Sequence, residues 1–220
     1  MQNKDEDRAW QAIRTQRLAV ADLLESLDDG EWRHPSLCDG WSVNDVAAHL
    51  TLQQVGLLDG LGMFARFPGG MNRAIRETAR RQAARISRPE LVARIRASAD
   101  SRRHNVGLSC LETLIDALVH GQDIARPLGR VLPVPPDAAA LAADQVWRKG
   151  WPFYPRRRLS GLRLAATDGE WTAGEGSEIR GTMGDLLLVL TGRGGAAVGD
   201  LDGDGVSELR RRLELATSPG

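Results

Sequence analysis

The chain has 220 residues, enough for one large domain or two small ones, and its 42% hydrophobic and 26% charged content is that of an ordinary globular protein. Its formal net charge of zero gives no electrostatic reason to expect binding to nucleic acid or to an anionic membrane. No apolar run reaches the ~18 residues that span a bilayer, and the polar N-terminus lacks the apolar segment of a signal peptide. With Cys38 and Cys110 as its two cysteines, we expect a cytoplasmic protein without a disulfide framework.

The first half of the chain has the apolar spacing of helices. A first helix is predicted over residues 10–27, and Asp-Asp-Gly at 28–30 ends it. Ser42 begins a second helix, because an aspartate three positions later makes a near capping box. After the break at Gly69-Gly70 comes a long, Arg-rich third helix, and a fourth covers 108–125. The apolar positions of the third helix include Ile86, Leu91 and Ile95. Four such helices predict a bundle, a fold that builds metal sites from facing helices.

Prolines between Pro127 and Pro136 mark a boundary, after which the sequence changes in character. The predicted elements there are a helix over 137–148, strands at 162–166, 171–173 and around 179, and helices over 182–190 and 207–215. The predicted fold class is therefore α+β. A four-helix bundle occupies residues 1–130, and a small C-terminal α+β module occupies residues 131–220.

Asp116 and His120 are the residues that point most directly to chemistry. A carboxylate and an imidazole four residues apart lie on the same face of a helix, which is how a helix offers two ligands to one metal ion. His49, in the second helix, is the third candidate ligand. Two histidines and one carboxylate leave a coordination position open, as in catalytic zinc sites. Zinc suits these donors, and nickel, iron or cobalt would also accept them.

Other interpretations of the same residues are open at this point. Asp123 also leans toward His120, so it is either a hydrogen-bond partner of a ligand imidazole or the carboxylate ligand in place of Asp116. Glu112 is a weaker substitute. A histidine on an apolar helix face is more often a hydrogen-bonded core residue than a ligand, and the Asp116–His120 spacing also fits a simple surface pair. Against this, both histidines lie in apolar stretches, where an unpartnered polar group is costly.

Four segments together resemble the mycothiol-dependent maleylpyruvate isomerase family, which belongs to the DinB-like metal-binding four-helix bundles of actinobacteria. The segments are LCDGWSVNDVAAHL at 37–50, LVHGQDIAR at 118–126, LAATDGEWTAG at 164–174 and LTGR at 190–193. The family's ligands are a histidine on the second helix and a Glu-x-x-x-His pair on the fourth. By that pattern they carry over to His49, Asp116 and His120. Asp116 departs from the usual Glu and is one methylene shorter, so it either needs a closer approach of the helices or lowers metal affinity.

The resemblance implies a zinc or other divalent metal cofactor and mycothiol, a small thiol, as cosubstrate. A divalent cation lowers the pKa of a bound thiol and supplies thiolate for attack on a small electrophile. The implied activity is an isomerase or an S-transferase. Arg193, and with less support Arg180, could bind a substrate carboxylate.

Two alternatives compete with the thiol-dependent enzyme. A hydrolase would hold water in the same open metal position. A bundle that binds a small molecule or a protein without turnover is favoured by the Asp116 departure. Trp41 and Trp171 are expected to serve packing first and pocket lining second. Asp200-Leu-Asp-Gly-Asp-Gly imitates half of a calcium loop, but Arg211 stands where a bidentate Glu is needed, so we expect a surface turn.

Overall fold

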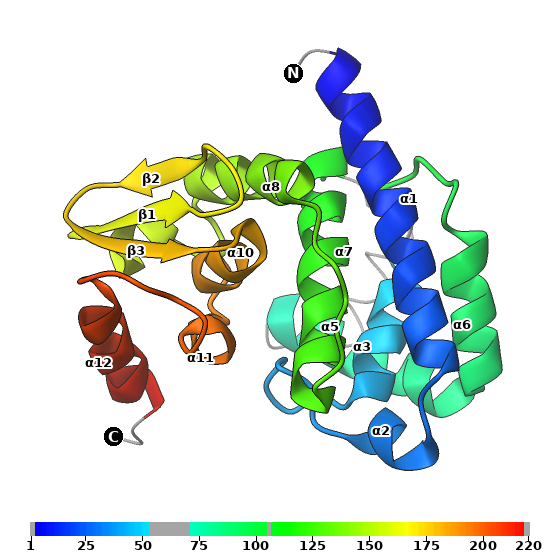
Figure 1. Ribbon diagram of the computed structural model, residues 1–220. Helices are drawn as coiled ribbons and strands as arrows, with labels where there is room; N and C mark the ends of the chain where they lie inside the picture. Colours follow the sequence, from blue (N-terminus) through cyan, green and yellow to red (C-terminus); the bar gives the residue numbers. More distant parts are fainter. Residues whose placement is uncertain (1–2, 53–70, 105–106, 218–220) are drawn as a thin grey trace. The chain divides into compact units, whose positions relative to one another are not determined.

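The computed structural model describes residues 3–52, 71–104 and 107–217 of the chain (Figure 1). Its contacts divide the chain into two compact units, Met1–Pro133 and Val134–Gly220. The assignment of two domains, at residues 1–130 and 131–220, stays a prediction. The predicted helix break at Gly69-Gly70 lies outside the described residues.

A four-helix bundle makes up the N-terminal unit. Its helices are α1 (Asn3–Glu25), α3 (Val43–Leu50), α6 (Arg88–Ala97) and α7 (Cys110–Ala125). Both α1 and α3 contact α6 and α7, so the four helices close a ring around a shared interior. Helix α5 (Met71–Arg85) packs on α3. The predicted bundle is therefore confirmed.

Two predicted boundaries in this unit are wrong. The long third helix is two helices, α5 and α6, because Pro89 occupies the first turn of α6 and Ser87 stands at its N-cap. The Asp-Asp-Gly at 28–30 begins a helix and does not end one. Helix α1 stops at Glu25, and Asp28 caps the short helix α2 (Asp29–Arg33) through a capping box with Glu31.

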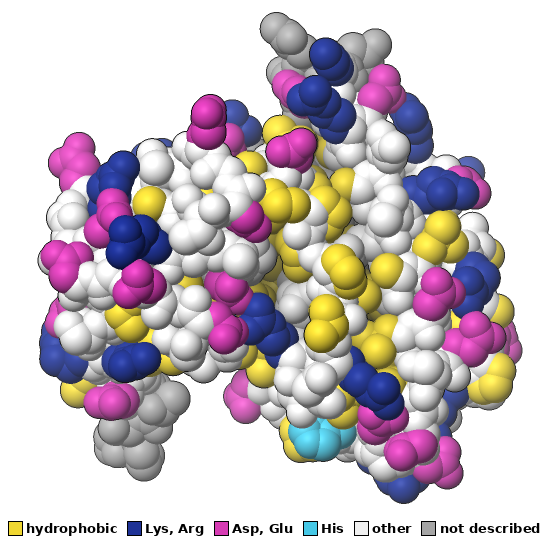
Figure 2. Space-filling model, in the orientation of Figure 1, with side chains coloured by type: hydrophobic (Ala, Val, Ile, Leu, Met, Phe, Trp, Pro, Cys, Tyr) yellow, Lys and Arg dark blue, Asp and Glu magenta, His cyan; other side chains and the backbone are white. Residues whose placement is uncertain are grey.

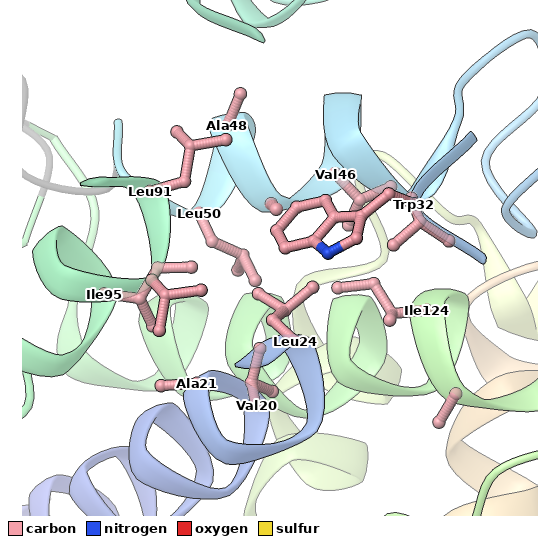
Figure 3. Close-up of a cluster of buried hydrophobic side chains, with 14 of the residues drawn as sticks. Val20, Ala21, Leu24, Trp32, Val46, Ala48, Leu50, Leu91, Ile95 and Ile124 are labelled. Atoms are coloured by element: carbon pink, nitrogen blue, oxygen red, sulfur yellow. The ribbon is translucent and has the colours of Figure 1, made fainter. Parts of the chain in front are cut away.

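The interior of the bundle is apolar over most of its length. Figure 3 shows side chains from α1, α2, α3, α6 and α7 pointing toward one another. The indole of Trp32, on α2, lies over this cluster and is 4% exposed. Leu24, Ile95 and Ile124 have at most 2% of their surface exposed. This core fixes the positions of α3 and α7, the two helices that carry the candidate metal ligands.

The C-terminal unit combines helices with a small sheet. Strands β1 (Leu162–Ala166), β2 (Thr172–Gly174) and β3 (Ser177–Gly181) lie in the order β2-β1-β3. The predicted hairpin is the antiparallel β1–β2 pair, and β3 pairs with β1 in parallel. The helices are α8 (Pro136–Lys149), α9 (Pro155–Arg158), α10 (Met183–Leu190), α11 (Gly194–Ala197) and α12 (Val206–Thr217), and α10 packs on α8, β1 and β3. The α+β class is confirmed.

Charged side chains lie mainly on the surface. On the face drawn in Figure 2, positive and negative side chains are interspersed over both units. No described helix combines the length and apolar character needed to cross a membrane. Neither Cys38, which is half-buried, nor Cys110, which is buried, forms a disulfide.

Candidate metal centre

His49 is carried by the last turn of α3. Ser42 caps that helix by accepting from the backbone of Asp45, whose carboxylate accepts from the Ser42 backbone in return. The predicted capping box is thus present, and it fixes where the helix starts. The apolar residues Val46, Ala47 and Leu50 then bury one side of α3 and leave the His49 ring at the edge of the bundle interior, with 18% of the side chain exposed.

Asp116 and His120 lie one turn apart on α7, as their spacing predicts. Asp116 Oδ1 is 3.1 Å from His120 Nε2 and 3.5 Å from His49 Nε2. The planes of the two imidazole rings are 79° apart, with 4.8 Å between their centres. The structure therefore brings together the three residues that the sequence singled out.

The spacing of these donor atoms suits a divalent cation. All three lie within 4.8 Å of one another. A tetrahedral zinc ion with nitrogen and oxygen ligands at ~2.0–2.1 Å needs donor atoms ~3.3 Å apart. The two distances from the Asp116 carboxylate lie on either side of that value. The shorter Asp116 side chain thus reaches both histidines. Three such donors leave a fourth position for an exogenous ligand.

The charges of the cluster stabilise one another. Burial raises the pKa of Asp116, but attraction to His120 and His49 and hydrogen bonds from both rings outweigh it and hold that pKa well below its ordinary range. Burial lowers the pKa of His120, but the Asp116 charge and hydrogen bonds to its neighbours raise it well above the ordinary value. A proton and a cation therefore compete for the same nitrogen, so metal binding would release protons.

The opposite edge of the His120 ring contacts a second group of side chains. His120 Nδ1 is 2.7 Å from Asp123 Oδ2, and the Cys38 thiol donates to the same oxygen over 3.0 Å. Trp41, 8% exposed, lies beside both histidine rings, with its centre 5.3 Å from that of His49 and 6.5 Å from that of His120. Asp123 therefore faces the Nδ1 side of the ring, away from the Asp116 carboxylate.

The remaining predicted site residues make other contacts. Glu112 accepts from the Ser109 backbone as part of the capping box that starts α7. In the C-terminal unit, Arg193 stands at the N-cap of α11 and donates to the Thr191 carbonyl over 2.8 Å. Arg180 forms an exposed ion pair with Asp202. Trp171 donates to Asp144.

The calcium-like stretch is a structural turn. Asp202 pairs with Arg180, and Asp204 accepts from the Glu178 backbone over 2.8 Å. The backbones of Arg180, on β3, and Asp202 also form an isolated antiparallel β-bridge. These carboxylates hold the turn against β3, as expected of a surface turn.

A protein-family model and two solved structures are similar to this chain. A family model described as the mycothiol maleylpyruvate isomerase N-terminal domain matches residues 13–109. Residues 13–109 are thus similar to that domain. The matched residues include His49 and end before α7 begins, so they do not extend to Asp116 or His120.

Two solved structures share the fold of this chain. One is the crystal structure of the mycothiol-dependent maleylpyruvate isomerase, at 15% identity and a TM-score of 0.61, covering 90% of this chain and 92% of that chain. The other is a histidine-to-alanine mutant of that isomerase, with the same identity and coverage and a TM-score of 0.60. At this identity the likeness shows a common fold. A comparison with curated proteins gave no match.

Two residues near the site were not identified as functional from the sequence. Cys38 contacts Asp123 across 85 positions of sequence. Arg17, on α1, is 4% exposed and donates to the carbonyls of Ser98 and Ser101. Burial lowers the pKa of Arg17, and the Asp116 charge opposes that shift. Neither contact has a local sequence signal, because each joins segments that only the tertiary fold brings together.

Proposed function

We propose that the chain is a metal-dependent enzyme that activates mycothiol for attack on a small electrophile, as an isomerase or an S-transferase. The observation that carries this proposal is that Nε2 of His49 and Nε2 of His120 lie 3.5 Å and 3.1 Å from the same carboxylate oxygen of Asp116. These distances suit three ligands of one divalent ion. The family of the N-terminal domain and the fold shared with a mycothiol-dependent maleylpyruvate isomerase support it.

In this proposal the three side chains hold zinc or a similar divalent cation. The bound cation lowers the pKa of a thiol and supplies thiolate at neutral pH. The chain's own contribution is to orient the donors: α3 presents one imidazole, α7 presents the carboxylate and the second imidazole, and Trp41 lies beside both rings. Thiolate addition to an electron-poor cis double bond leaves a rotatable single bond, and elimination returns the thiolate with the trans product. Release of the adduct gives a transferase.

Arg193 is proposed as the cation that binds a substrate carboxylate. A guanidinium presents a planar fork of donors that matches a carboxylate. Arg193→Lys retains the charge but loses the fork, so it should raise KM for an acidic electrophile more than it lowers kcat. Equal kinetic constants for Arg193→Lys and the unaltered protein would remove Arg193 from the proposal.

The first test is the metal content of protein purified without an affinity tag or chelator, measured by elemental mass spectrometry. We expect about one divalent ion per chain, lost in His49→Ala and in His120→Ala, with most of the fold retained by circular dichroism. His34→Ala is the matched control, because His34 is exposed and its ring contacts the carbonyl of the neighbouring Pro35. Metal retained at full stoichiometry in His120→Ala would refute its assignment as a ligand.

The second test separates the possible activities. Mycothiol and maleylpyruvate are supplied with and without metal. Conversion to the trans isomer that needs both thiol and metal supports an isomerase, and a stable thioether product supports a transferase. Turnover that needs metal but no thiol would instead indicate a hydrolase. No turnover with these and other electrophiles, together with a melting temperature raised by ligand, would favour the non-catalytic binding module.

A further inference from the structure

His120 has a carboxylate beside each of its two ring nitrogens. Nε2 of His120 faces Asp116, and Nδ1 lies 2.7 Å from Asp123 Oδ2. Asp123 has no exposed surface, although it is ionisable. A buried carboxylate is costly unless it is hydrogen-bonded, so its partners are part of what the fold has to provide.

Two donors converge on this one carboxylate oxygen. The thiol of Cys38 donates to Asp123 Oδ2 over 3.0 Å, and the same sulfur is 3.6 Å from His120 Nδ1. The distances of 2.7 and 3.0 Å are hydrogen-bond distances. Cys38, His120 and Asp123 therefore form a hydrogen-bonded network.

The backbone keeps Cys38 in place over Asp123. The Leu37 amide donates to the Asp123 carbonyl over 3.1 Å, so the loop is attached to α7 at the same residue twice. Within the loop, the Cys38 amide donates to Ser36 Oγ and the Trp41 amide donates to the Cys38 carbonyl. The same turn brings the Trp41 ring beside His120, at an angle of 26° between the planes.

The distances to these partners favour one tautomer of His120. Both ring nitrogens face carboxylates, which accept hydrogen bonds, but the Nδ1 contact with Asp123 (2.7 Å) is shorter than the Nε2 contact with Asp116 (3.1 Å), so the neutral imidazole is expected to carry its proton on Nδ1. Its lone pair is then on Nε2, the nitrogen that faces Asp116 and His49. A histidine binds a metal through the nitrogen that has no proton, and a partner on the other nitrogen both selects that nitrogen and orients the ring.

We propose that Asp123 is a positioning residue, which holds His120 as the Nδ1–H tautomer with Nε2 directed at the ligand cluster, and that the Cys38 thiol in turn holds the Asp123 carboxylate. The metal part of this inference rests on the proposed function, whereas the tautomer part concerns the protein without metal.

The test begins with the tautomer, read by ¹⁵N NMR of metal-free protein with labelled histidine, at a pH at which the ring is neutral. We expect His120 as Nδ1–H in the unaltered chain and as a mixture rich in Nε2–H in Asp123→Ala. Asp123→Asn should restore Nδ1–H, because an amide oxygen also accepts a hydrogen bond. If His120 keeps the Nδ1–H form in Asp123→Ala, or has the Nε2–H form in the unaltered chain, the inference is overturned.

The second readout is zinc affinity, measured by competition with a chromogenic chelator. Loss of a partner of a ligand histidine typically lowers metal affinity 10–100-fold, so Asp123→Ala should fall in that range. Cys38→Ser, which keeps a donor, should lose less than Cys38→Ala. Asp185→Ala is the matched control, since Asp185 is another buried aspartate but bonds Thr182 in the C-terminal unit. Unchanged zinc affinity in folded Asp123→Ala, or an equal loss in Asp185→Ala, would contradict a positioning role.

The two readouts separate this inference from the proposed function. Zinc binding without thiol-dependent turnover would end the enzymatic proposal and leave the positioning of His120 measurable by affinity. If the unaltered chain bound no zinc, the NMR experiment alone would decide, because the tautomer of His120 does not depend on the ion.

Discussion

The two units of the chain use buried polar side chains differently. In the C-terminal unit, buried Asp185 bonds Thr182 at the start of α10, and buried Thr191 bonds the Leu187 carbonyl at its end. In the bundle, buried Arg17 bonds backbone 81 positions away, and Asp123 bonds Cys38 85 positions away. These contacts finish a helix in the C-terminal unit, whereas in the bundle they join a helix to a distant segment. Where a polar group joins distant segments, a site can form.

The largest expected effect is the loss of an apolar side chain from the C-terminal unit. Leu164, on β1, has no exposed surface. Leu164→Ala removes buried methyl groups and leaves a cavity, so we expect a loss of about 2–5 kcal/mol in the free energy of unfolding. Urea denaturation followed by circular dichroism measures it. Leu215→Ala, on an exposed side chain of α12, is the control and should change stability by less than ~0.5 kcal/mol. Equal losses in both variants would show that this unit does not depend on its apolar core.

A smaller effect is expected where the bundle uses a buried cation. Arg17→Met keeps much of the side-chain volume but leaves the Ser98 and Ser101 carbonyls without the guanidinium. Since a hydrogen bond to a charged group contributes ~1.5–3 kcal/mol, we expect a loss in that range. Arg14→Met is the matched control on the same helix, because Arg14 pairs with Asp100 at the surface and such pairs contribute at most ~1 kcal/mol. A loss in Arg17→Met no greater than in Arg14→Met would remove the distinction drawn between the units.

Loss of a helix N-cap side chain should lower the free energy of unfolding by a similar amount in the two units. Ser42 accepts from the Asp45 amide at the start of α3, and Thr182 accepts from the Asp185 amide at the start of α10. Replacing either by alanine should cost about 1 kcal/mol in the free energy of unfolding. Thermal unfolding monitored by circular dichroism measures both variants. Ser42→Ala should also weaken zinc binding, because α3 positions His49, whereas Thr182→Ala should not.

The smallest effect concerns an exposed ion pair in the C-terminal unit. Hydrogen bonds from Arg211 and then Arg212 lower the pKa of Glu208 from 4.5 to about 2. Because the folded-state pKa is the lower one, the contribution to stability is complete above pH 4.5 and is lost as the pH falls toward 2. Carboxyl ¹³C NMR measures the pKa directly. Replacing both arginines by glutamine should return it to near 4.5, and an unchanged value would contradict the assigned cause.

The sequence predicted what depends on local chemistry. Ser42 and Thr182 were correctly placed at helix starts, since capping is a relation between residues three positions apart. The break before α6 was missed, although Pro89 signals it, because Arg residues on both sides continue the helical pattern. The convergence of His49 with the Asp116–His120 pair needed a family resemblance, since spacing within α7 says nothing of which helix lies opposite. Cys38 was missed because its partner depends on how a loop folds back onto α7.

His49 belongs to α3, whereas Asp116 and His120 belong to α7, a helix much later in the chain. The three donors are therefore close only when the bundle is folded, and an unfolded chain offers an ion no comparable set. By mass action, an ion that binds only the folded chain adds about 2.7 kcal/mol to the free energy of unfolding at a hundred times its Kd. A chelator that removes the ion would then lower the melting temperature of the folded protein, and that temperature would report the concentration of available metal.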